Sequence, residues 1–494
     1  MAANTDPRLQ NQVIYSIYVR NHTSEGTFRA VIPDLDRIRA LGTDIIWLMP
    51  IHPIGVEGKK GTLGCPYANR DYRAVNPAYG TMEDFEALVR EIHARGMKCM
   101  IDVVYNHTSP DSVLYREHPE YFYRGPDGKP GNKLGDWADV IDLDYSNRGL
   151  WQYLTDTLVM WAGLVDGFRC DVASFVPVEF WLQARAAVAA VNPDCIWLAE
   201  TVHRSYGCLA RRHGVYSAPD GEVFRAFDLE YEYDVREVFD QYLRGEVPLS
   251  RYLDALSFQE ACYPANYNKL RFLENHDQPR IASFVRDERA LVNDTAMLYF
   301  LKGTTLLYAG QEFENDHLPS LFDLDPIDRC TGRDLSGLLR RLYAVKHQLG
   351  SADWFFADAD DANDLALLQR GSAGKRFVGV FSLKAKAADV RVDAVLVQDM
   401  GVARIIQQSY PHLVLHASTQ MTINNAQGAR LMKDMGFSRV VPARECTLDE
   451  LRKMADVGVE VEAFAHGALC VAVSGQCLFS SMIGGRSGNR GRCA

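Results

Sequence analysis

The sequence lacks the features of several protein classes. No run of about 18 apolar residues occurs among its 494 residues, so no membrane-spanning helix is expected. The start, MAANTDPRLQ, has neither the basic nor the apolar region of a secretion signal. Basic residues (53) are fewer than acidic ones (64), and the net charge of −11 argues against general nucleic-acid binding.

The cysteines lack the pattern of a disulfide framework. There are eleven, an odd number, scattered along a chain without a recognisable secretion signal. Reduced thiols in a cytoplasm fit this usage better than disulfides. We therefore expect a cytoplasmic protein with no membrane and no nucleic-acid partner. The sequence does not define its oligomeric state.

What the sequence does contain is a repeated alternation of short apolar runs with amphipathic, helix-like stretches. Such alternation predicts a parallel sheet covered by helices. Eight repeats predict a (β/α)8 TIM barrel as the fold class. The runs cover residues 13–19, 45–50, 97–105, 164–171, 195–200, 224–230, 269–275 and 303–310.

Two departures from the repeat indicate further parts. The connection over 106–147 is rich in Gly, Pro, Asp and aromatic residues, and predicts a short inserted domain after the third strand. The barrel is expected to cover residues 1–350. After it, the segments LALLQR and RFVGVFSL resemble antiparallel strands. We expect a truncated C-terminal β-domain at 351–390. Strand and helix alternation resumes at 391–494, which predicts part of a second α/β barrel.

Polar residues gather where the barrel strands end. In parallel barrels the carboxyl ends of the strands carry the chemistry. A turn is the plain alternative for the stretch FLENHD, because Asn and Asp favour turns. Several carboxylates that converge on one rim shift one another's pKa, however, which is typical of a functional site rather than of a purely structural one. The stretches are DVVYNH (102–107), GFRCD (167–171), AE (199–200) and FLENHD (272–277).

This set of side chains suits glycoside hydrolysis. One carboxylate attacks the anomeric carbon and a second protonates the leaving oxygen, through an oxocarbenium-like transition state. Arg169, two residues before Asp171 on one strand, points to the same face and would keep Asp171 ionised.

These motifs, with GTDIIWLMPI (42–51) and GQEF (310–313), resemble glycoside hydrolase family 13, the α-amylase family, over about residues 10–390. The resemblance implies Asp171 as nucleophile, Glu200 as general acid/base and Asp277 as transition-state stabiliser. It implies an α-retaining reaction, in which the two reacting carboxyl groups stand about 5–5.5 Å apart. The substrates would be α-1,4-linked glucans or maltooligosaccharides.

The same resemblance implies the residues around the cleaved bond. His107, His276 and Arg169 would line the subsite there, Tyr67 would stack on its sugar, and Asp102 would brace the site. Family members often bind calcium at the position of Asn106. No cofactor is expected to be required, and calcium at Asn106 stays open.

The chain departs from the family after the nucleophile. Residues 172–175 are Val, Ala, Ser and Phe, where many members have a His or Lys-His that contacts the acceptor and supports calcium. Short maltooligosaccharides, or glucosyl transfer by a transglycosylase, are then as plausible as starch hydrolysis. Aromatic residues of the inserted segment are sugar-platform candidates, with core packing the preferred interpretation: Tyr121, Phe122, Tyr123 and Trp137.

The last part of the chain resembles a different family. HASTQMTINNAQGA (416–429) and GGRSGNRGRCA (484–494) are similar to the collagenase-like peptidase family, U-class family 32, over about residues 392–494. Cys470, Cys477 and Cys493 match positions that ligate an iron–sulfur cluster in some members, and thiolates are what such a cluster needs. Ordinary buried thiols are the preferred interpretation of Cys470 and Cys477, and no cluster is expected in this chain.

We infer that two truncated sequences are joined near residues 388–395, because both flanking domains lack strands that would close their sheets. Three alternatives to a glucan hydrolase stay open. Residues 391–494 would be the remnant of a peptidase or of an iron–sulfur protein that hydroxylates RNA or quinones. The barrel would be a non-catalytic transporter partner, although such partners usually lose the carboxylates. Or the joined chain would aggregate and have no function.

Overall fold

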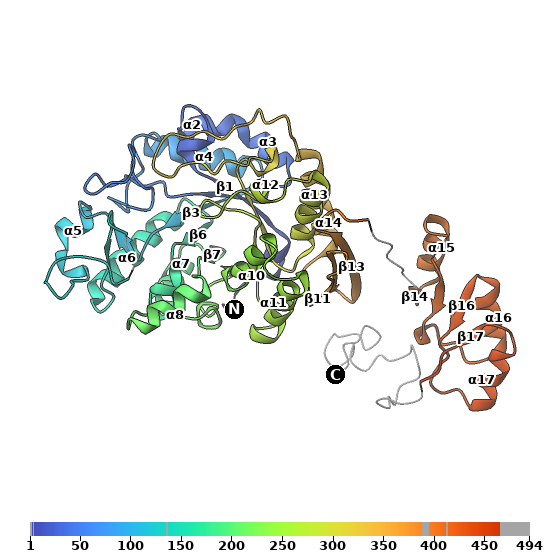
Figure 1. Ribbon diagram of the computed structural model, residues 1–494. Helices are drawn as coiled ribbons and strands as arrows, with labels where there is room; N and C mark the ends of the chain where they lie inside the picture. The colour runs from blue at the N-terminus through green and yellow to red at the C-terminus, as the bar shows by residue number, and fades with distance from the viewer. Residues whose placement is uncertain (1, 3, 135–136, 388–394, 412, 465–494) are drawn as a thin grey trace. The chain divides into compact units, whose positions relative to one another are not determined.

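The computed structural model describes residues 2, 4–134, 137–387, 395–411 and 413–464 (Figure 1). The chain divides into two compact units, residues 1–387 and residues 388–494. Each unit is described by itself below. Among the described residues, no helix combines the length and the apolar character needed to cross a membrane.

A closed barrel of eight parallel strands forms the centre of the first unit, which confirms the predicted TIM barrel. Around the barrel the order is β1-β10-β9-β8-β7-β6-β3-β2, so neighbouring strands follow one another in sequence. Seven of the eight predicted runs contain one of these strands, and the sixth run, 224–230, overlaps only the first two residues of β8. The eight strands are β1 (Val13–Ile17), β2 (Ile45–Leu48), β3 (Lys98–Val103), β6 (Gly167–Cys170), β7 (Ile196–Ala199), β8 (Leu229–Tyr231), β9 (Lys269–Arg271) and β10 (Thr304–Tyr308).

Helices follow the strands and bury one apolar face against them. The helix α4 (Met82–Ala94) shows why they form where they do: Thr81 and Asp84 make a reciprocal capping box at its start. Its buried residues Phe85, Leu88 and Ile92 recur at helical spacing. The other long helices of the unit are α6 (Arg148–Ala162), α7 (Val178–Ala189), α8 (Arg204–Arg212), α10 (Tyr233–Leu243), α11 (Leu249–Cys262), α13 (Glu288–Phe300) and α14 (Ser336–Leu349).

Short helices occupy the loops around the barrel. Four-to-six-residue α-helices are α1 (Val19–His22), α2 (Phe28–Val31), α3 (Leu35–Ala40), α5 (Val113–Glu117), α9 (Asp220–Val223) and α12 (Ile281–Phe284). Single 3-10 turns are η1 (Pro7–Asn11), η2 (Ile32–Asp34), η3 (Pro119–Tyr121), η4 (Ala173–Phe175) and η5 (Gln311–Phe313).

The long connection between β3 and α6 is an excursion with little regular structure. A two-stranded antiparallel pair, β4 (His107–Thr108) and β5 (Ile141–Asp142), closes its base. Because β4 directly follows β3, the excursion begins at the carboxyl end of the barrel, beside the predicted site.

The expected antiparallel strands after the barrel form a three-stranded sheet in the order β11-β12-β13. The sheet packs against α11, where the Ser257 hydroxyl accepts from Ala357 N and donates to Ala357 O at 3.0 and 3.1 Å. Arg370 is fully buried and donates to Phe300 O at 2.9 Å. The strands are β11 (Trp354–Asp360), β12 (Leu365–Ser372) and β13 (Lys375–Ser382).

In the second unit the described residues form a small open sheet of four parallel strands, in the order β14-β15-β16-β17. The strand and helix alternation was predicted, but no second barrel closes within residues 395–464. The strands are β14 (Val395–Val397), β15 (Leu415–Ala417), β16 (Phe437–Val440) and β17 (Glu460–Val461). Three helices connect them: α15 (Met400–Ser409), α16 (Ala426–Asp434) and α17 (Leu448–Ala455), with one 3-10 turn, η6 (Thr419–Met421).

Candidate active site

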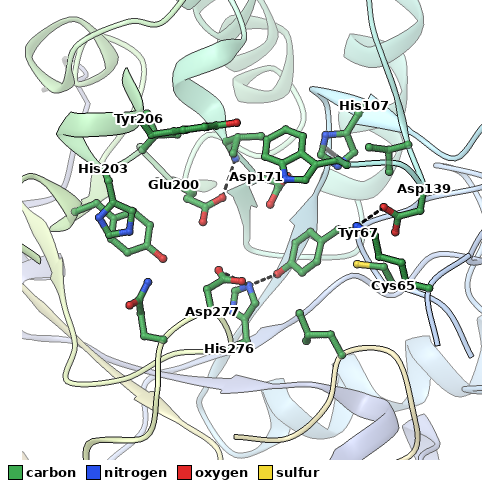
Figure 2. Close-up of a pocket in the computed structure, with 18 of the residues that line it drawn as sticks. Cys65, Tyr67, His107, Asp139, Asp171, Glu200, His203, Tyr206, His276 and Asp277 are labelled. Carbon is green, nitrogen blue, oxygen red and sulfur yellow. Dashed lines mark hydrogen bonds and ion pairs between the residues drawn. The ribbon is translucent and has the colours of Figure 1, made fainter. Parts of the chain in front are cut away.

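A cavity of about 370 Å³ lies at the carboxyl ends of the barrel strands. Asp171 follows β6, Glu200 follows β7, and Asp277 lies in the loop after β9. Figure 2 shows these three carboxylates facing the same space, with Tyr67, His107 and His276 around them. The structure therefore brings together the three predicted catalytic residues and three of the predicted substrate-binding residues.

Arg169 lies behind the cavity wall and links the carboxylates. Its Nη1 donates to Asp102 Oδ1 at 2.9 Å and to Asp171 Oδ1 at 2.8 Å. Its Nη2 lies 2.9 Å from Glu200 Oε2 as an ion pair. Arg169 and Asp102 are fully buried and do not line the cavity, so both act on the site through the carboxylates.

The environment gives the two central carboxyl groups different pKa values. Burial, opposed by Arg169, raises the pKa of Asp171 to about 6. Burial and the neighbouring Asp171 raise the pKa of Glu200 further, to about 8, against the opposing effect of Arg169. Near neutral pH, Asp171 is therefore mainly ionised and Glu200 mainly protonated. This is the division of states that a nucleophile and a general acid require.

A strained turn sets the orientation of Glu200. Val172 has a φ of 35°, in the left-handed region that β-branched residues rarely adopt. In this conformation Val172 N donates to Glu200 Oε2 at 2.9 Å. Strain of this kind is held in place by surrounding contacts and is concentrated at functional sites.

The stretch FLENHD is both a turn and part of the site. Asn275 Oδ1 accepts from Asp277 N and Gln278 N, each at 2.9 Å, which is the turn that Asn favours. Glu274 does not line the cavity, and its Oε1 accepts from Arg280 Nη1 at 2.6 Å.

His276 and Asp277 form an ion pair at 3.0 Å. Burial alone would lower the pKa of His276, but Asp277 outweighs it and raises that pKa. Burial would raise the pKa of Asp277, but His276 and Arg169 hold it below its ordinary value. The Tyr67 ring is stacked on His276, and its hydroxyl donates to Asp102 Oδ2 at 3.0 Å.

The position of Asn106 does not suit calcium. Its side-chain nitrogen donates to His107 Nδ1 at 3.1 Å, and it shares a cavity with Lys133 and Asp142. Lys133 Nζ donates there to Leu143 O at 2.6 Å, and this ammonium group would repel a cation. Among the described residues, no cluster of three His, Cys, Asp or Glu side chains has the arrangement of a metal site. Cys470, Cys477 and Cys493 lie outside the described residues.

The cavity is also lined by residues that the sequence motifs did not indicate. On the side of Glu200, Figure 2 shows His203, which precedes α8, and Tyr206 of α8; Tyr233 also lines the cavity. His203 stacks on Tyr233 with ring centroids 4.2 Å apart. His203 could have been predicted as a site residue, because it comes three residues after Glu200 in the segment that follows the same strand. Figure 2 shows Cys65 and Asp139 on the opposite side, and Lys60 pairs with Asp139 there. Leu321 and Phe322 complete this part of the lining, which only the folding of three loops brings together.

Of the aromatic residues proposed as sugar platforms, Trp137 lines the cavity and lies 5.6 Å from the His107 ring. Phe122 is buried against Tyr115, and Tyr121 is stacked on His118. Phe122 and Tyr121 therefore pack against neighbouring rings, as the preferred interpretation expected.

Comparisons with known proteins agree with the two parts of the chain. The profile of the α-amylase catalytic domain matches residues 14–138 and 133–334, and that of peptidase family U32 matches residues 378–494. An α-amylase from Lactobacillus plantarum is 44% identical, with a TM-score of 0.76, over 80% of this chain and 93% of that one. A noncanonic maltogenic α-amylase, AmyB, from Thermotoga neapolitana is 34% identical, with a TM-score of 0.68, over 76% of this chain and 86% of that one.

Among curated proteins, the α-amylase MalA of Haloarcula japonica is 29% identical over 317 residues, which are 62% of this chain and 44% of that protein. Three maltosyltransferases match over 28% to 32% of their length. The chain thus spans less than half the length of these four relatives.

Proposed function

This chain belongs to the α-amylase family of glycosidases, and we propose that it hydrolyses α-1,4-linked glucans or maltooligosaccharides with retention of the α configuration. The observation that carries the proposal is the pair of carboxyl groups, Asp171 and Glu200, that Arg169 contacts at the cavity, with pKa values near 6 and 8. No cofactor is needed for this chemistry.

In the first half of the proposed reaction, ionised Asp171 attacks the anomeric carbon and forms a covalent glycosyl-enzyme. Glu200 gives its proton to the leaving glycosidic oxygen, so no alkoxide has to depart. Arg169 holds Asp171 by a 2.8 Å hydrogen bond, which keeps the attacking carboxylate in one orientation. In the second half, Glu200 takes a proton from water as that water attacks the same carbon.

The other residues stabilise the positive charge that develops on the sugar. Asp277 is ionised and faces the same cavity, so its charge opposes the charge of the oxocarbenium-like transition state. Asn106 donates to His107 Nδ1, which leaves the ring proton on Nε2 as a donor to a sugar hydroxyl. Tyr67 supplies an aromatic face fixed by His276.

The test is product analysis of maltoheptaose incubated with the purified protein, beside an Asp171→Asn variant. The proposal predicts shorter oligosaccharides from the wild type and none from the variant. A folded wild-type protein that releases nothing from maltoheptaose would contradict it.

Transglycosylation is the second candidate, and the aromatic lining on the side of Glu200 favours it. Trp137 and Tyr206 lie with ring centroids 6.3 Å apart, and Phe175 packs on Tyr206 at 5.7 Å. In this proposal the apolar faces of Trp137 and Tyr206 pack on a sugar acceptor and displace water from the glycosyl-enzyme. Products longer than maltoheptaose in the same experiment would assign transfer. No activity is proposed for residues 388–494, since their candidate ligands lie outside the described residues.

A further inference from the structure

Three loops meet on the side of the cavity opposite to Glu200. They are residues 55–64 after β2, residues 138–139 of the inserted segment, and residues 320–323 after β10. We call them together the donor wall. The first loop contributes Lys60 to the cavity lining, the second contributes Asp139, and the third contributes Leu321 and Phe322.

Specific contacts tie the donor wall together. Lys60 Nζ pairs with Asp139 Oδ1 at 2.9 Å, and the Asp139 side chain is 4% exposed. Thr62 donates to Asp323 Oδ1 from its backbone nitrogen at 2.9 Å and from its hydroxyl at 2.7 Å. Leu63 N donates to Phe322 O at 2.9 Å. The wall is thus held by links from the first loop to each of the other two.

Two features show that this arrangement is built into the fold. Arg20 is buried and donates to Gly64 O at 3.0 Å and to Leu321 O at 3.1 Å, so one guanidinium group joins two of the loops. Gly61 has a φ of +63°, and a Cβ there would lie 2.5 Å from Phe322 Cβ. Only glycine permits the two loops to approach this closely.

The proposed roles of Asp171 and Glu200 determine which end of the substrate lies against the donor wall. This inference therefore rests on the proposed function. The leaving sugar must face Glu200, so it lies toward His203 and Tyr206. The attacked sugar lies against Tyr67 and His107. Sugars joined to its O4, toward the non-reducing end, must extend toward Cys65 and Asp139, where Figure 2 shows the opposite side of the cavity.

We propose that the donor wall closes this side of the cavity after about one or two sugars, in keeping with a cavity near the lower size limit of ligand sites. The enzyme then acts from the non-reducing end and removes short units. Lys60, Asp139 and Asp323 are specificity-determining residues: they set where the chain is cut rather than whether it is cut.

The experiment uses the full chain and maltoheptaose labelled with a fluorophore at its reducing end. The leaving fragment keeps the label, so its length in the first turnovers reports how many sugars the donor side held. The wild type is expected to give labelled maltopentaose or maltohexaose first. Lys60→Ala and Asp323→Ala each remove one link, and labelled maltotriose and maltotetraose should then rise about fivefold, a factor that a partly exposed ion pair allows.

Two matched variants separate an opened wall from general damage. Lys59 is the neighbouring lysine, and among the described residues its ammonium donates within its own loop, to Thr62 O at 2.7 Å. Lys59→Ala should keep the wild-type products. Asp323→Asn keeps the acceptor oxygen for Thr62 and should restore them relative to Asp323→Ala.

The outcomes are distinct. Labelled maltotriose and maltotetraose as first products of the wild type would overturn the donor wall while leaving glucan hydrolysis intact. An unchanged pattern in both Lys60→Ala and Asp323→Ala would also overturn it. A wild type that cleaves no labelled substrate would instead overturn the proposed function, and this proposal with it.

Discussion

At the scale of single residues, the site depends on one arginine that several acids share. Arg169 contacts Asp102, Asp171 and Glu200 within 3.1 Å, and all four side chains are at least nine-tenths buried. One positive charge cannot keep three buried carboxyl groups ionised at low cost. The acid whose ionised form is stabilised least therefore retains its proton. This acid is Glu200, which has a pKa of about 8.

The pH dependence of activity follows from these states. In the proposed reaction Asp171 attacks only when ionised, so kcat/KM should fall as the pH drops below about 6. In the same reaction Glu200 donates a proton only when protonated, so kcat/KM should fall as the pH rises above about 8. A profile of kcat/KM against pH on maltotriose checks both limbs. A flat profile between pH 5 and pH 9 would contradict the assigned states.

The Glu200→Gln variant tests proton donation separately. Its kcat on maltotriose should fall by about 10²–10⁴, because the leaving alkoxide receives no proton. Its glycosylation rate on α-maltosyl fluoride should fall far less, since fluoride departs without protonation. Pre-steady-state release of fluoride measures that rate. Equal losses on the two substrates would exclude Glu200 as the general acid. In Asp171→Asn, both substrates should lose activity together.

The site residues that follow directly on the barrel strands could be predicted from the sequence. Asp171, Glu200, His107 and His276 reach one cavity because parallel strands end at one rim. The left-handed conformation of Val172 was not predictable, since nothing in the local sequence favours it. The pairing of Lys60 with Asp139 was not predictable either, because it depends on how two irregular loops fold together.

At the scale of elements, one helix carries a buried acid that has no function in the proposed reaction. Asp294 of α13 is 2% exposed and lies at a cavity of about 150 Å³ beside Leu383 and Lys384, which follow β13. Its Oδ2 has no hydrogen-bond partner among the described residues. Burial raises the pKa of Asp294 to about 8.

This acid should make the stability of the barrel depend on pH. The folded chain holds the Asp294 proton between about pH 4 and pH 8, where the unfolded chain releases it, so unfolding becomes easier as the pH rises through that window. Asp294→Asn should raise the free energy of unfolding by about 1–3 kcal/mol at pH 9 and change it little at pH 4.

Denaturant titration at the two pH values measures the difference. The exposed Asp358 offers a matched control, since Asp358→Asn removes the same charge from the surface. A gain in Asp294→Asn that is equal at pH 4 and pH 9 would show that ionisation of Asp294 is not its cause.

The elements themselves were largely predictable, because most barrel strands are apolar runs and the long helices have an apolar face. The exception is β9 (Lys269–Arg271), which has two charged residues and was predicted only as part of the longer run 269–275. The alternation of apolar runs with helices predicted all eight barrel strands. The inserted segment was recognisable only by composition, since its short β4 and β5 depend on pairing across more than thirty residues. In the second unit, the same alternation predicted strands and helices but not whether the sheet closes.

At the scale of the whole molecule, the chain consists of two units that match two unrelated families. The barrel and the sheet β11–β13 share one unit, and every residue of the candidate active site lies within it. The activity should therefore depend on that unit alone.

A chain ending at residue 387 tests this. It should keep the melting temperature and the kcat/KM of the full chain on maltotriose, because no cavity residue is removed. Scanning calorimetry and initial rates on both chains provide the comparison. Loss of activity in a shortened chain that still melts cooperatively would show that residues 388–494 contribute to the site.

The central claim is that a covalent glycosyl-enzyme forms on Asp171. The most direct measurement is peptide mass spectrometry after reaction with 5-fluoro-α-maltosyl fluoride, whose second fluorine slows release of the intermediate. The account predicts one added fluorinated maltosyl group per chain, on the peptide that contains Asp171. An adduct on any other carboxylate, or no adduct from a protein that cleaves maltoheptaose, would contradict it.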